Sequence, residues 1–420
     1  MAHRILPLAL ALGIGCTQTT IPQVPTPSPA VSVRSPHPAS TVAPPSPSVA
    51  WTPAFSPAAG SWVDEIGSAV SGRDVSVVIG VGHRIVYRYR GATPRILASN
   101  EKLLTSMAAL DLLGTRFRFR TRAETAADVR HGVVRGDLWL VGGGDPTLTT
   151  IDLDALAGNL ADAGVRRIMG RVVGDTAAFD RGWWAPGWIR PISRAFVDRP
   201  TALRLTGTGS GLEGAAAAAF RDALARVGVE VDGGSATGTA PNGLRPLAVD
   251  VSAPLGDLLA HQNHESDNLY AELTTKRLGA DPGVSGSTAL GARAIHAWAE
   301  GYGVDAAVRD GSGLSDQDRT PALGVVTLLL AAQRRPWFPV FDRSLPAGGE
   351  GTLAGRLVGV PVRAKTGTLF VRPTSTLSGY VTTRDGQTVT FSVLTHDLPE
   401  ATALAIEDAV VRAIAGATIG

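Results

Sequence analysis

Two of the three lysines in this chain lie in short motifs whose residue types could carry out acyl transfer. All its other Lys and Arg residues are arginines, which stay charged in proteins, whereas a buried lysine can lose its proton and act as a base. Lys102 closes the motif Ser99-Asn100-Glu101-Lys102, and Lys365 opens Lys365-Thr366-Gly367-Thr368. In this arrangement we expect Ser99 to be a nucleophile and Lys102, if neutral, to take its proton.

The motif at Lys365 contains groups that could hold the end of a substrate. Lys365 and the hydroxyls of Thr366 and Thr368 could bind a carboxylate, while Gly367 would let a substrate backbone come close. We also expect Lys365 to help keep Lys102 neutral by repulsion between like charges.

Another motif, Ser266-Asp267-Asn268, lies between these two along the chain, so it is the second of the three motifs and the one at Lys365 is the third. Ser266 could relay a proton to a leaving group, and Asn268 could bind an amide of the substrate. Taken singly, each motif also has a structural interpretation, in which Ser99 caps a helix and residues 266–268 are a polar helix start. All three motifs in this order are far less expected by chance, and together they favour catalysis.

The elements that must position these motifs follow from periodicity. Apolar residues at helical spacing predict a helix over residues 99–113, which places Lys102 one turn after Ser99 on the same face. We expect a strand over residues 360–371, around the Lys365 motif. Further predicted elements are β-hairpins over 75–89 and 376–395 and helices over 63–70 and 399–415. Strands at both chain ends predict one antiparallel sheet built from the N- and C-terminal parts.

The bulk composition indicates a globular protein with a large core. The chain has 420 residues, of which 44% are hydrophobic and 18% charged. A net charge of +2 is too small to indicate binding to nucleic acid or an acidic membrane surface. After the N-terminus no apolar run reaches the length of a transmembrane helix. We expect a catalytic domain over 61–144 and 246–420, with an inserted domain over 145–245.

The N-terminal segment has the pattern of an export signal. Arg4 precedes an apolar run that ends near residue 15, and the only cysteine, Cys16, follows directly. The position favours a lipidated Cys16, with ordinary signal cleavage or an uncleaved anchor as alternatives. Residues 16–60 are rich in Pro, Ser and Thr, which predicts either an extended tether or a disordered leader.

The chain resembles the class C low-molecular-mass penicillin-binding proteins, the D-alanyl-D-alanine carboxypeptidase/endopeptidase family. The three motifs carry this resemblance, and so does the gap of 167 residues between Ser99 and Ser266. Further matching segments are Gly142-Gly-Gly-Asp-Pro-Thr-Leu148, Asp310-Gly-Ser-Gly-Leu-Ser315, Phe341-Asp-Arg-Ser-Leu-Pro346 and Leu377-Ser-Gly-Tyr-Val381. The resemblance implies an α/β (α+β) penicillin-binding/β-lactamase-like serine transpeptidase fold, with an antiparallel sheet flanked by helices and a domain inserted between the first and second motifs. One departure is Thr395-His396-Asp397, where the family commonly has Asn.

The resemblance also implies a function and its partners. It implies a serine D-alanyl-D-alanine carboxypeptidase or endopeptidase that acts on peptidoglycan stem peptides through a Ser99 acyl-enzyme and is acylated by β-lactams. It places the oxyanion hole at the backbone N–H groups of Ser99 and Thr368. We expect the protein at the outer face of the cytoplasmic membrane, in the periplasm or in the cell wall, with a lipid anchor at Cys16. A β-lactamase and a catalytically idle wall-binding protein are the alternatives.

Two other patterns are weak indications of a bound nucleotide and of a bound metal. Residues 209–214 fit a Gly-x-Gly-x-x-Gly pattern after the strand-like residues 202–206, with Glu230 and Asp232 further on, but the predicted insertion is small for a dinucleotide domain. His261, His264 and Glu265 have helical spacing but lack the order His-Glu-x-x-His of zinc peptidases. We therefore expect no cofactor and no metal.

Overall fold

The computed structural model describes residues 53–207, 212–370 and 372–419. The expected export signal, Cys16, most of the expected tether and the glycines at 209 and 211 lie outside the described residues. Within the described ranges, no helix combines the length and apolar character that a membrane crossing requires.

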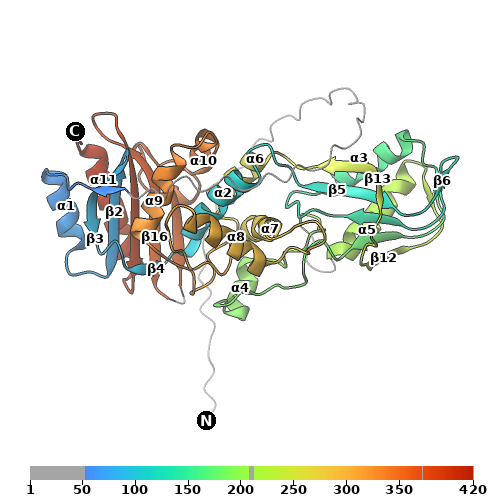
Figure 1. Ribbon diagram of the computed structural model, residues 1–420, viewed down its shortest axis with the longest axis horizontal. Coiled ribbons are helices and arrows are strands. Elements are labelled where there is room, and N and C mark those ends of the chain that lie inside the picture. The colour runs from blue at the N-terminus through green and yellow to red at the C-terminus, as the bar shows by residue number, and fades with distance from the viewer. Residues whose placement is uncertain (1–52, 208–211, 371, 420) are drawn as a thin grey trace, which may run out of the picture. The chain divides into compact units, whose positions relative to one another are not determined.

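One six-stranded sheet joins the N- and C-terminal parts of the chain, as expected (Figure 1). Its order is β1-β3-β2-β17-β16-β15, and all neighbours are antiparallel except β1 and β3. The strands are β1 (Ala54–Phe55), β2 (Val75–Val81), β3 (Arg84–Tyr89), β15 (Val362–Leu369), β16 (Thr374–Thr382) and β17 (Thr388–His396). Because β15 is the last strand in this order, its outer edge has no neighbouring strand of the sheet.

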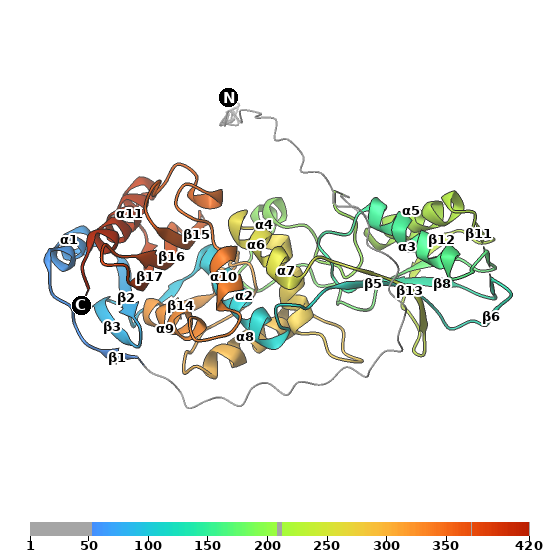
Figure 2. The ribbon, with the colours of Figure 1, turned by 90° about the horizontal axis from the view of Figure 1, so that it is seen from above.

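Helices cover both faces of this sheet, so all seven residues of β2 are buried (Figure 2). On one face α1 (Ser61–Val70) and α11 (Glu400–Gly416) pack with residues such as Val77 and Val393. On the other face α9 (Ala322–Ala332) and α2 (Glu101–Leu112) pack with Val78 and Leu394. The predicted mixed fold, an antiparallel sheet flanked by helices, is therefore confirmed.

The remaining elements near α2 surround the second motif. They are β4 (Pro94–Ile96), α6 (Leu255–His264), α7 (Asn268–Leu278), α8 (Thr288–Glu300), β14 (Arg319–Pro321), α10 (Phe338–Ser344) and the 3-10 turn η2 (Gly351–Leu353). Every residue of α2 from Glu101 to Leu110 is buried, so this helix is the centre around which the others pack. The predicted helix is correct except at its start, where residues Ala98–Asn100 form the 3-10 turn η1.

A second core is built around a five-stranded sheet of order β12-β10-β8-β5-β13, beside a small four-stranded sheet of order β11-β9-β7-β6. The strands are β5 (Arg120–Thr125), β6 (Val129–Arg130), β7 (Val133–Val134), β8 (Leu138–Val141), β9 (Arg167–Ile168), β10 (Val172–Asp175), β11 (Glu230–Val231), β12 (Ser235–Gly238) and β13 (Arg245–Val251). The helices α3 (Thr150–Asp162) and α5 (Leu212–Arg226) pack on these sheets through residues such as Leu156 and Phe220.

The bounds of this second core differ from those expected of the insertion. Its sheet begins at Arg120 rather than near residue 145, because β5 pairs antiparallel with β13 and so brings the two ends of the segment together. The segment at 202–206 is not a strand. Its backbone instead forms hydrogen bonds with residues 144–148. The Gly144 amide donates to the Ala202 carbonyl, and the Thr206 amide donates to the Leu148 carbonyl.

Candidate active site

Ser99 lies in a tight turn, and two glycines, Gly313 and Gly367, pack directly against the backbone of this turn. The residue before it, Ala98, has a left-handed φ of 46°, a strained value that is often found at functional sites. A Cβ built on Gly313 would lie 1.8 Å from the Ala98 carbonyl oxygen, and one built on Gly367 would lie 2.9 Å from the Ser99 nitrogen. Only glycine therefore fits at these two positions, and both motifs close tightly around Ser99.

Lys102 is fully buried one turn later and points at the nucleophile. Its Nζ lies 3.1 Å from the Ser99 Oγ, 2.7 Å from the Asn268 Oδ1 and 2.6 Å from the Ser312 carbonyl oxygen. A carbonyl and an amide oxygen can only accept, so they use two N–H bonds of the amine. In a neutral amine, the lone pair then faces the Ser99 hydroxyl, which is the geometry of a general base.

Burial lowers the pKa of the Lys102 ammonium to about 8, although nearby carboxylates such as Asp310 and Glu272 act in the opposite direction. This value brings the neutral base within reach near neutral pH. We expected Lys365 to keep Lys102 neutral by repulsion. Burial is the largest cause, and the repulsion is seen instead in Lys365, whose pKa is lowered well below its usual range by burial and then by Lys102.

The second motif is a strained turn that ends in a helix cap. Ser266 has a left-handed φ of 57°, and the Asp267 carboxylate accepts from the amides of Leu269 and Tyr270 to start α7. Asn268 is the first residue of that helix, and its Nδ2 donates to the Phe196 carbonyl at 2.9 Å. Asn268 is thus held by two partners, Lys102 on one side and the Phe196 carbonyl on the other.

The third motif lies on β15, whose outer edge faces away from β16. Towards that edge the Gly348 amide donates to the Val362 carbonyl, and the Ala364 amide donates to the Pro346 carbonyl. The backbone groups of a strand alternate between its two sides. Those of Thr366 and Thr368 therefore lie on the same free edge, where the Thr368 N–H can meet a ligand beside Ser99.

Lys365 itself does not face the cleft. It is fully buried, and its Nζ donates to the Thr366 carbonyl oxygen at 2.9 Å. Its own carbonyl accepts from the Asn100 Nδ2 at 2.9 Å, which ties β15 to the Ser99 turn. Thr366 donates its hydroxyl to the Thr352 Oγ1.

A cavity of about 520 Å³ collects residues from all three motifs. The predicted residues that line it are Ser99, Ser266, Asn268, Thr366, Gly367 and Thr368. Lys102 and Lys365 lie behind this lining as buried groups. The sequence thus identified residues that the fold brings together although they are far apart in the chain.

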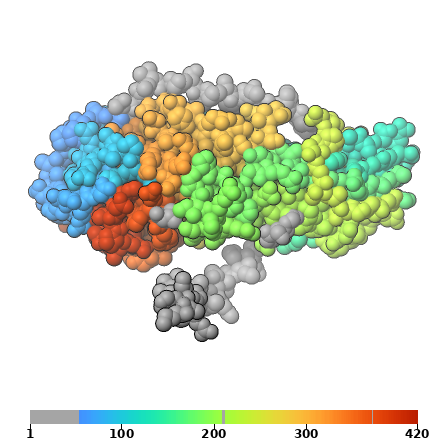
Figure 3. All heavy atoms as spheres, turned by 90° about the horizontal axis from the view of Figure 1, so that it is seen from below, coloured from blue at the N-terminus to red at the C-terminus, as the bar shows by residue number. Residues whose placement is uncertain are grey.

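Other lining residues were missed, and four of them, Ile189, Ile192, Ser193 and Phe196, come from one short segment. The short helix α4 (Arg190–Phe196) and Ile189 before it line the cavity, together with Phe370 and with Glu400 and Leu404 of α11. Figure 3 shows this face, where the green segment that carries α4 lies beside the red C-terminal segment. One signal was available, because three of the eight tryptophans of the chain occur within residues 183–188.

Four buried carboxyl groups stand behind Lys102, and none of them was predicted to be functional. Two have hydrogen-bond donors. The Glu272 Oε1 accepts from the amides of Gly311 and Ser312 at 3.0 Å each, while Asp310 accepts from two amides of its own loop and from the Trp188 Nε1 at 2.5 Å. Burial and the nearby Asp310 raise the pKa of Glu272 to about 7, while its amide donors act in the opposite direction.

The other two carboxyl groups, those of Glu101 and Asp318, have fewer hydrogen-bond donors. Both oxygens of Glu101 and the Oδ2 of Asp318 are buried without a hydrogen-bond partner among the described residues. Burial raises the pKa of each well above its usual range, and the nearby Asp310 acts in the same direction. Neutral forms of Glu101 and Asp318 therefore limit the negative charge around Lys102, which would otherwise hold its proton more firmly.

The third lysine, Lys276, has a structural role. It is fully buried, and its Nζ donates to the Asp180 carboxylate at 2.6 Å and to the carbonyls of Asp180 and Gly182. It fixes the segment that leads towards α4.

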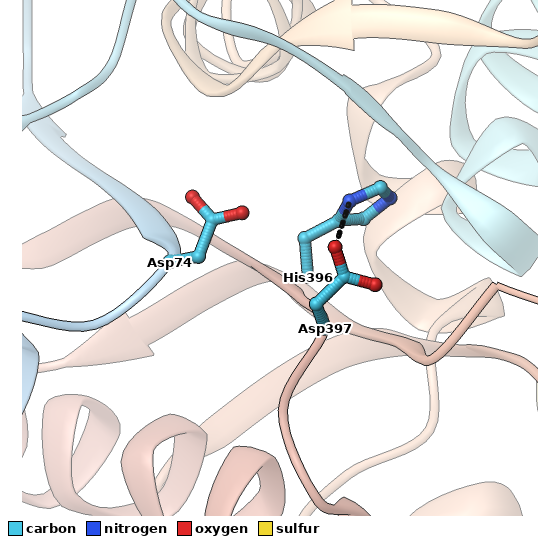
Figure 4. A group of neighbouring side chains, drawn as sticks. All are labelled: Asp74, His396 and Asp397. Carbon is cyan, nitrogen blue, oxygen red and sulfur yellow. Dashed lines mark ion pairs between the residues drawn. The ribbon is translucent and has the colours of Figure 1, made fainter.

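Two groups could be considered as metal ligands. Asp74, His396 and Asp397 have ligand atoms within 4.8 Å of one another (Figure 4). Asp74 is already engaged, because its Oδ1 accepts from Arg95 at 2.6 Å and from Arg90 at 3.2 Å, and their charges disfavour a cation.

The other group, at the end of α6, is also engaged. The His261 ring lies against Tyr270, tilted by 36° with ring centroids 4.4 Å apart, and its Nε2 lies 3.4 Å from the Asp267 Oδ2. These contacts give His261 a structural role beside the second motif.

Comparisons with known proteins agree with this geometry. A model of the D-Ala-D-Ala carboxypeptidase 3 (S13) family matches residues 64–212 and 202–416. The chain is 31% identical to the D-alanyl-D-alanine carboxypeptidase of Actinomadura sp. (strain R39), covering 81% of this chain and 80% of that protein. It is 30% identical to the carboxypeptidase DacB of Mycolicibacterium smegmatis, covering 71% of each. Penicillin-binding protein 4 of Haemophilus influenzae has the same fold, with a TM-score of 0.73, 22% identity and coverage of 84% of this chain and 99% of that one.

Proposed function

This chain belongs to the D-Ala-D-Ala carboxypeptidase 3 (S13) family, and from that premise we propose how its cleft performs the reaction. The protein is a serine D-alanyl-D-alanine carboxypeptidase. We assign the nucleophile to Ser99 and the base to Lys102. The supporting observation is the position of the Lys102 Nζ. It lies 3.1 Å from the Ser99 Oγ and also donates to the Asn268 Oδ1 and the Ser312 carbonyl oxygen.

In the acylation step, the Ser99 Oγ gives its proton to the Lys102 Nζ and bonds to the carbonyl carbon of the penultimate D-Ala. The N–H groups of Ser99 and Thr368 stabilise the negative charge on the carbonyl oxygen. The C–N bond then breaks, and the proton passes from Lys102 through the Ser266 hydroxyl to the leaving amine. Free D-Ala leaves, and an ester joins the substrate to Ser99.

In the deacylation step, a water molecule gives a proton to Lys102 and attacks the ester carbon. The ester C–O bond breaks, the proton returns to the Ser99 Oγ, and a carboxylic acid leaves. Thr366 and Thr368 form the end of the cleft that holds the terminal carboxylate of the substrate, with Lys365 buried behind them. The lowered pKa of Lys102, caused by burial, supports its role in both steps.

We propose peptidoglycan stem peptides as the substrate and β-lactams as acylating inhibitors. The test is to incubate the full chain with benzylpenicillin, measure its intact mass, and assay D-Ala release from a D-Ala-D-Ala peptide. A stable single adduct and D-Ala release, both lost in Ser99→Ala, are expected. Rapid drug hydrolysis without an adduct would favour a β-lactamase. No adduct and no hydrolysis would favour an idle wall-binding protein.

The protein acts outside the cytoplasm, as its family implies. We further propose that Cys16 carries a lipid and that the Pro-rich segment behind it spans part of the envelope. This rests on the sequence pattern alone. Labelling of the wild-type chain, but not of Cys16→Ser, with a fatty acid in the producing cell tests it.

A further inference from the structure

A second cavity, of about 460 Å³, shares no lining residue with the cleft that contains Ser99. One of its walls is a face of α8, and the other walls are Trp184 with its neighbours and the segment 305–309. The α8 residues that border it are Thr288, Ala289, Ala292, Arg293 and His296. The two alanines keep this wall thin, and the volume falls within the range of small-ligand sites.

Two of the walls are fixed by contacts within the protein. Trp184 stacks on Trp183 with ring centroids 4.7 Å apart. The Asp180 carboxylate, which also lines the cavity, lies 2.6 Å from the buried Nζ of Lys276, so its charge is already balanced. Fixed walls favour binding, because little order has to be gained when a ligand enters.

Three other charged side chains of this lining, Arg293, Asp305 and Arg309, are exposed and have no partner of opposite charge among the residues that the structure describes. Arg293 and Asp305 form neither a hydrogen bond nor an ion pair within the same residues. The Arg309 guanidinium donates only to the neutral Val308 carbonyl, at 3.0 Å. Charges of both signs thus line one cavity without pairing with one another.

A ligand that carries both charges complements this lining. A carboxylate would form charge-assisted hydrogen bonds with Arg293 or Arg309, and an ammonium group would form them with Asp305. A ligand with only one kind of charge would leave some of these groups unpaired and would meet a like charge. Ala289 and Ala292 leave space for the uncharged part of the ligand.

The cavity adjoins the groups that lie behind Lys102. The Thr288 hydroxyl donates to the Glu272 Oε2 at 3.4 Å, and the Glu272 Oε1 accepts from the Ser312 amide at 3.0 Å. The Ser312 carbonyl in turn accepts from the Lys102 Nζ at 2.6 Å. A ligand beside Thr288 therefore contacts a residue that a short series of hydrogen bonds connects to the base.

We propose that this cavity is a second ligand site, which binds a zwitterion with a free ammonium group and a free carboxylate, and that its occupancy regulates the acylation of Ser99. The zwitterion is an amino acid or a short peptide. Two sources share this chemistry, the D-alanine that the reaction releases and a peptide with free ends. The regulatory part rests on the proposed function, whereas the binding part does not.

The binding test titrates the full chain with four ligands, followed by saturation-transfer NMR. They are D-alanine, triglycine, N-acetyl-D-alanine, which has no ammonium group, and D-alaninamide, which has no carboxylate. We expect the preferred zwitterion to bind with a Kd on the order of 1 mM. Each singly charged analogue should bind about tenfold more weakly or worse. Tighter binding of D-alanine assigns the reaction product as the ligand, and tighter binding of triglycine assigns a peptide.

Two variants locate the binding site. Arg293→Gln and Asp305→Asn each remove one unpaired charge and should weaken the binding of the zwitterion by about tenfold. The matched control is Arg412→Gln, because Arg412 is exposed on α11 and lines neither cavity. The control should bind as the wild type does, and acylation of Ser99 by benzylpenicillin should leave the binding in place.

The regulatory test measures the rate of acylation by benzylpenicillin with and without a saturating concentration of the zwitterion. Occupancy of the second site should change this rate by about fivefold or more in the wild type but not in Arg293→Gln. The variant keeps the cleft unchanged, so any competition within the cleft appears equally in both proteins.

Three results would overturn the inference. Absent binding, or equal binding of all four ligands or of wild type and variants, would refute the second site. Binding of the zwitterion with an unchanged acylation rate would refute its regulatory role. A wild-type chain that benzylpenicillin does not acylate would refute the proposed function and the regulatory role with it, while the NMR titration decides the binding site separately.

Discussion

Replacing Gly313 with alanine should disable the nucleophile without removing any reacting group. Gly313 has a φ of 80°, and a Cβ at this position would lie 1.8 Å from the Ala98 carbonyl oxygen and 3.1 Å from the Ser99 nitrogen. Both contacts are with backbone atoms, which cannot rotate away. To reach an ordinary contact distance, the loop and the Ser99 turn must move apart by roughly 1.5 to 2 Å.

The magnitude follows from this displacement. A shift of about 1 Å in reacting geometry costs on the order of 100-fold in rate. The same loop supplies the Ser312 carbonyl that holds the Lys102 Nζ at 2.6 Å, so the base moves together with the turn. We therefore expect Gly313→Ala to slow acylation by benzylpenicillin by at least ~100-fold. The left-handed φ adds about 1–2 kcal/mol to the loss in unfolding free energy.

The assay is the rate of adduct formation by intact mass, with thermal unfolding measured on the same samples. The control is Gly72→Ala, because Gly72 has a similar φ of 71° but no heavy atom within 4 Å of a built Cβ. It should be slightly destabilised and fully active. Gly313→Ala with an acylation rate within about threefold of wild type would show that the tight approach to Ser99 is not required.

Three further predictions concern titration and burial. Because burial lowers the pKa of Lys102 to about 8, the acylation rate should rise about tenfold per pH unit below pH 8 and level off above it, which a pH–rate profile with 6-aminopenicillanic acid will test. Burial raises the pKa of Glu407 to about 7, so the folded state holds this proton more tightly than the unfolded chain does. Raising the pH from about 4.5 to 7 should then lower the unfolding free energy by up to about 3 kcal/mol, and urea titrations should show a smaller loss in Glu407→Gln. Asp111→Asn should cost about 3 kcal/mol in urea unfolding, because the buried Asp111 carboxylate accepts from Arg335 at 2.5 Å and from two tryptophans and a tyrosine.

The helices and hairpins of the catalytic core were predictable because the spacing of apolar residues within each segment specifies them. The spacing of apolar residues predicted the helix that carries Lys102, and alternation predicted the two hairpins that the structure contains as β2–β3 and β16–β17. The pairing of β2 with β17, through contacts such as Val78 with Ser392, agrees with the expected sheet from both chain ends. These elements are specified by residues close in sequence and by one apolar face.

Other features depend on contacts between distant residues, and no periodicity encodes them. The 3-10 turn at Ser99 is set by Gly313 and Gly367, which are more than two hundred residues away in the chain. The start of the second core at Arg120 depends on the pairing of β5 with β13. Glu101 lies in a polar motif, and only its burial, with the charges of Asp310 and Glu272 nearby, indicates a neutral acid.

One amide connects the base with the short helix α4. The Oδ1 of Asn268 accepts from the Lys102 Nζ at 2.7 Å, and its Nδ2 donates to the Phe196 carbonyl at 2.9 Å. An amide group is planar, so a rotation that follows a shift of α4 also moves the acceptor that orients the base. The position of α4 therefore affects the residue that holds Lys102 in line with Ser99, and proton transfer by the base depends on it.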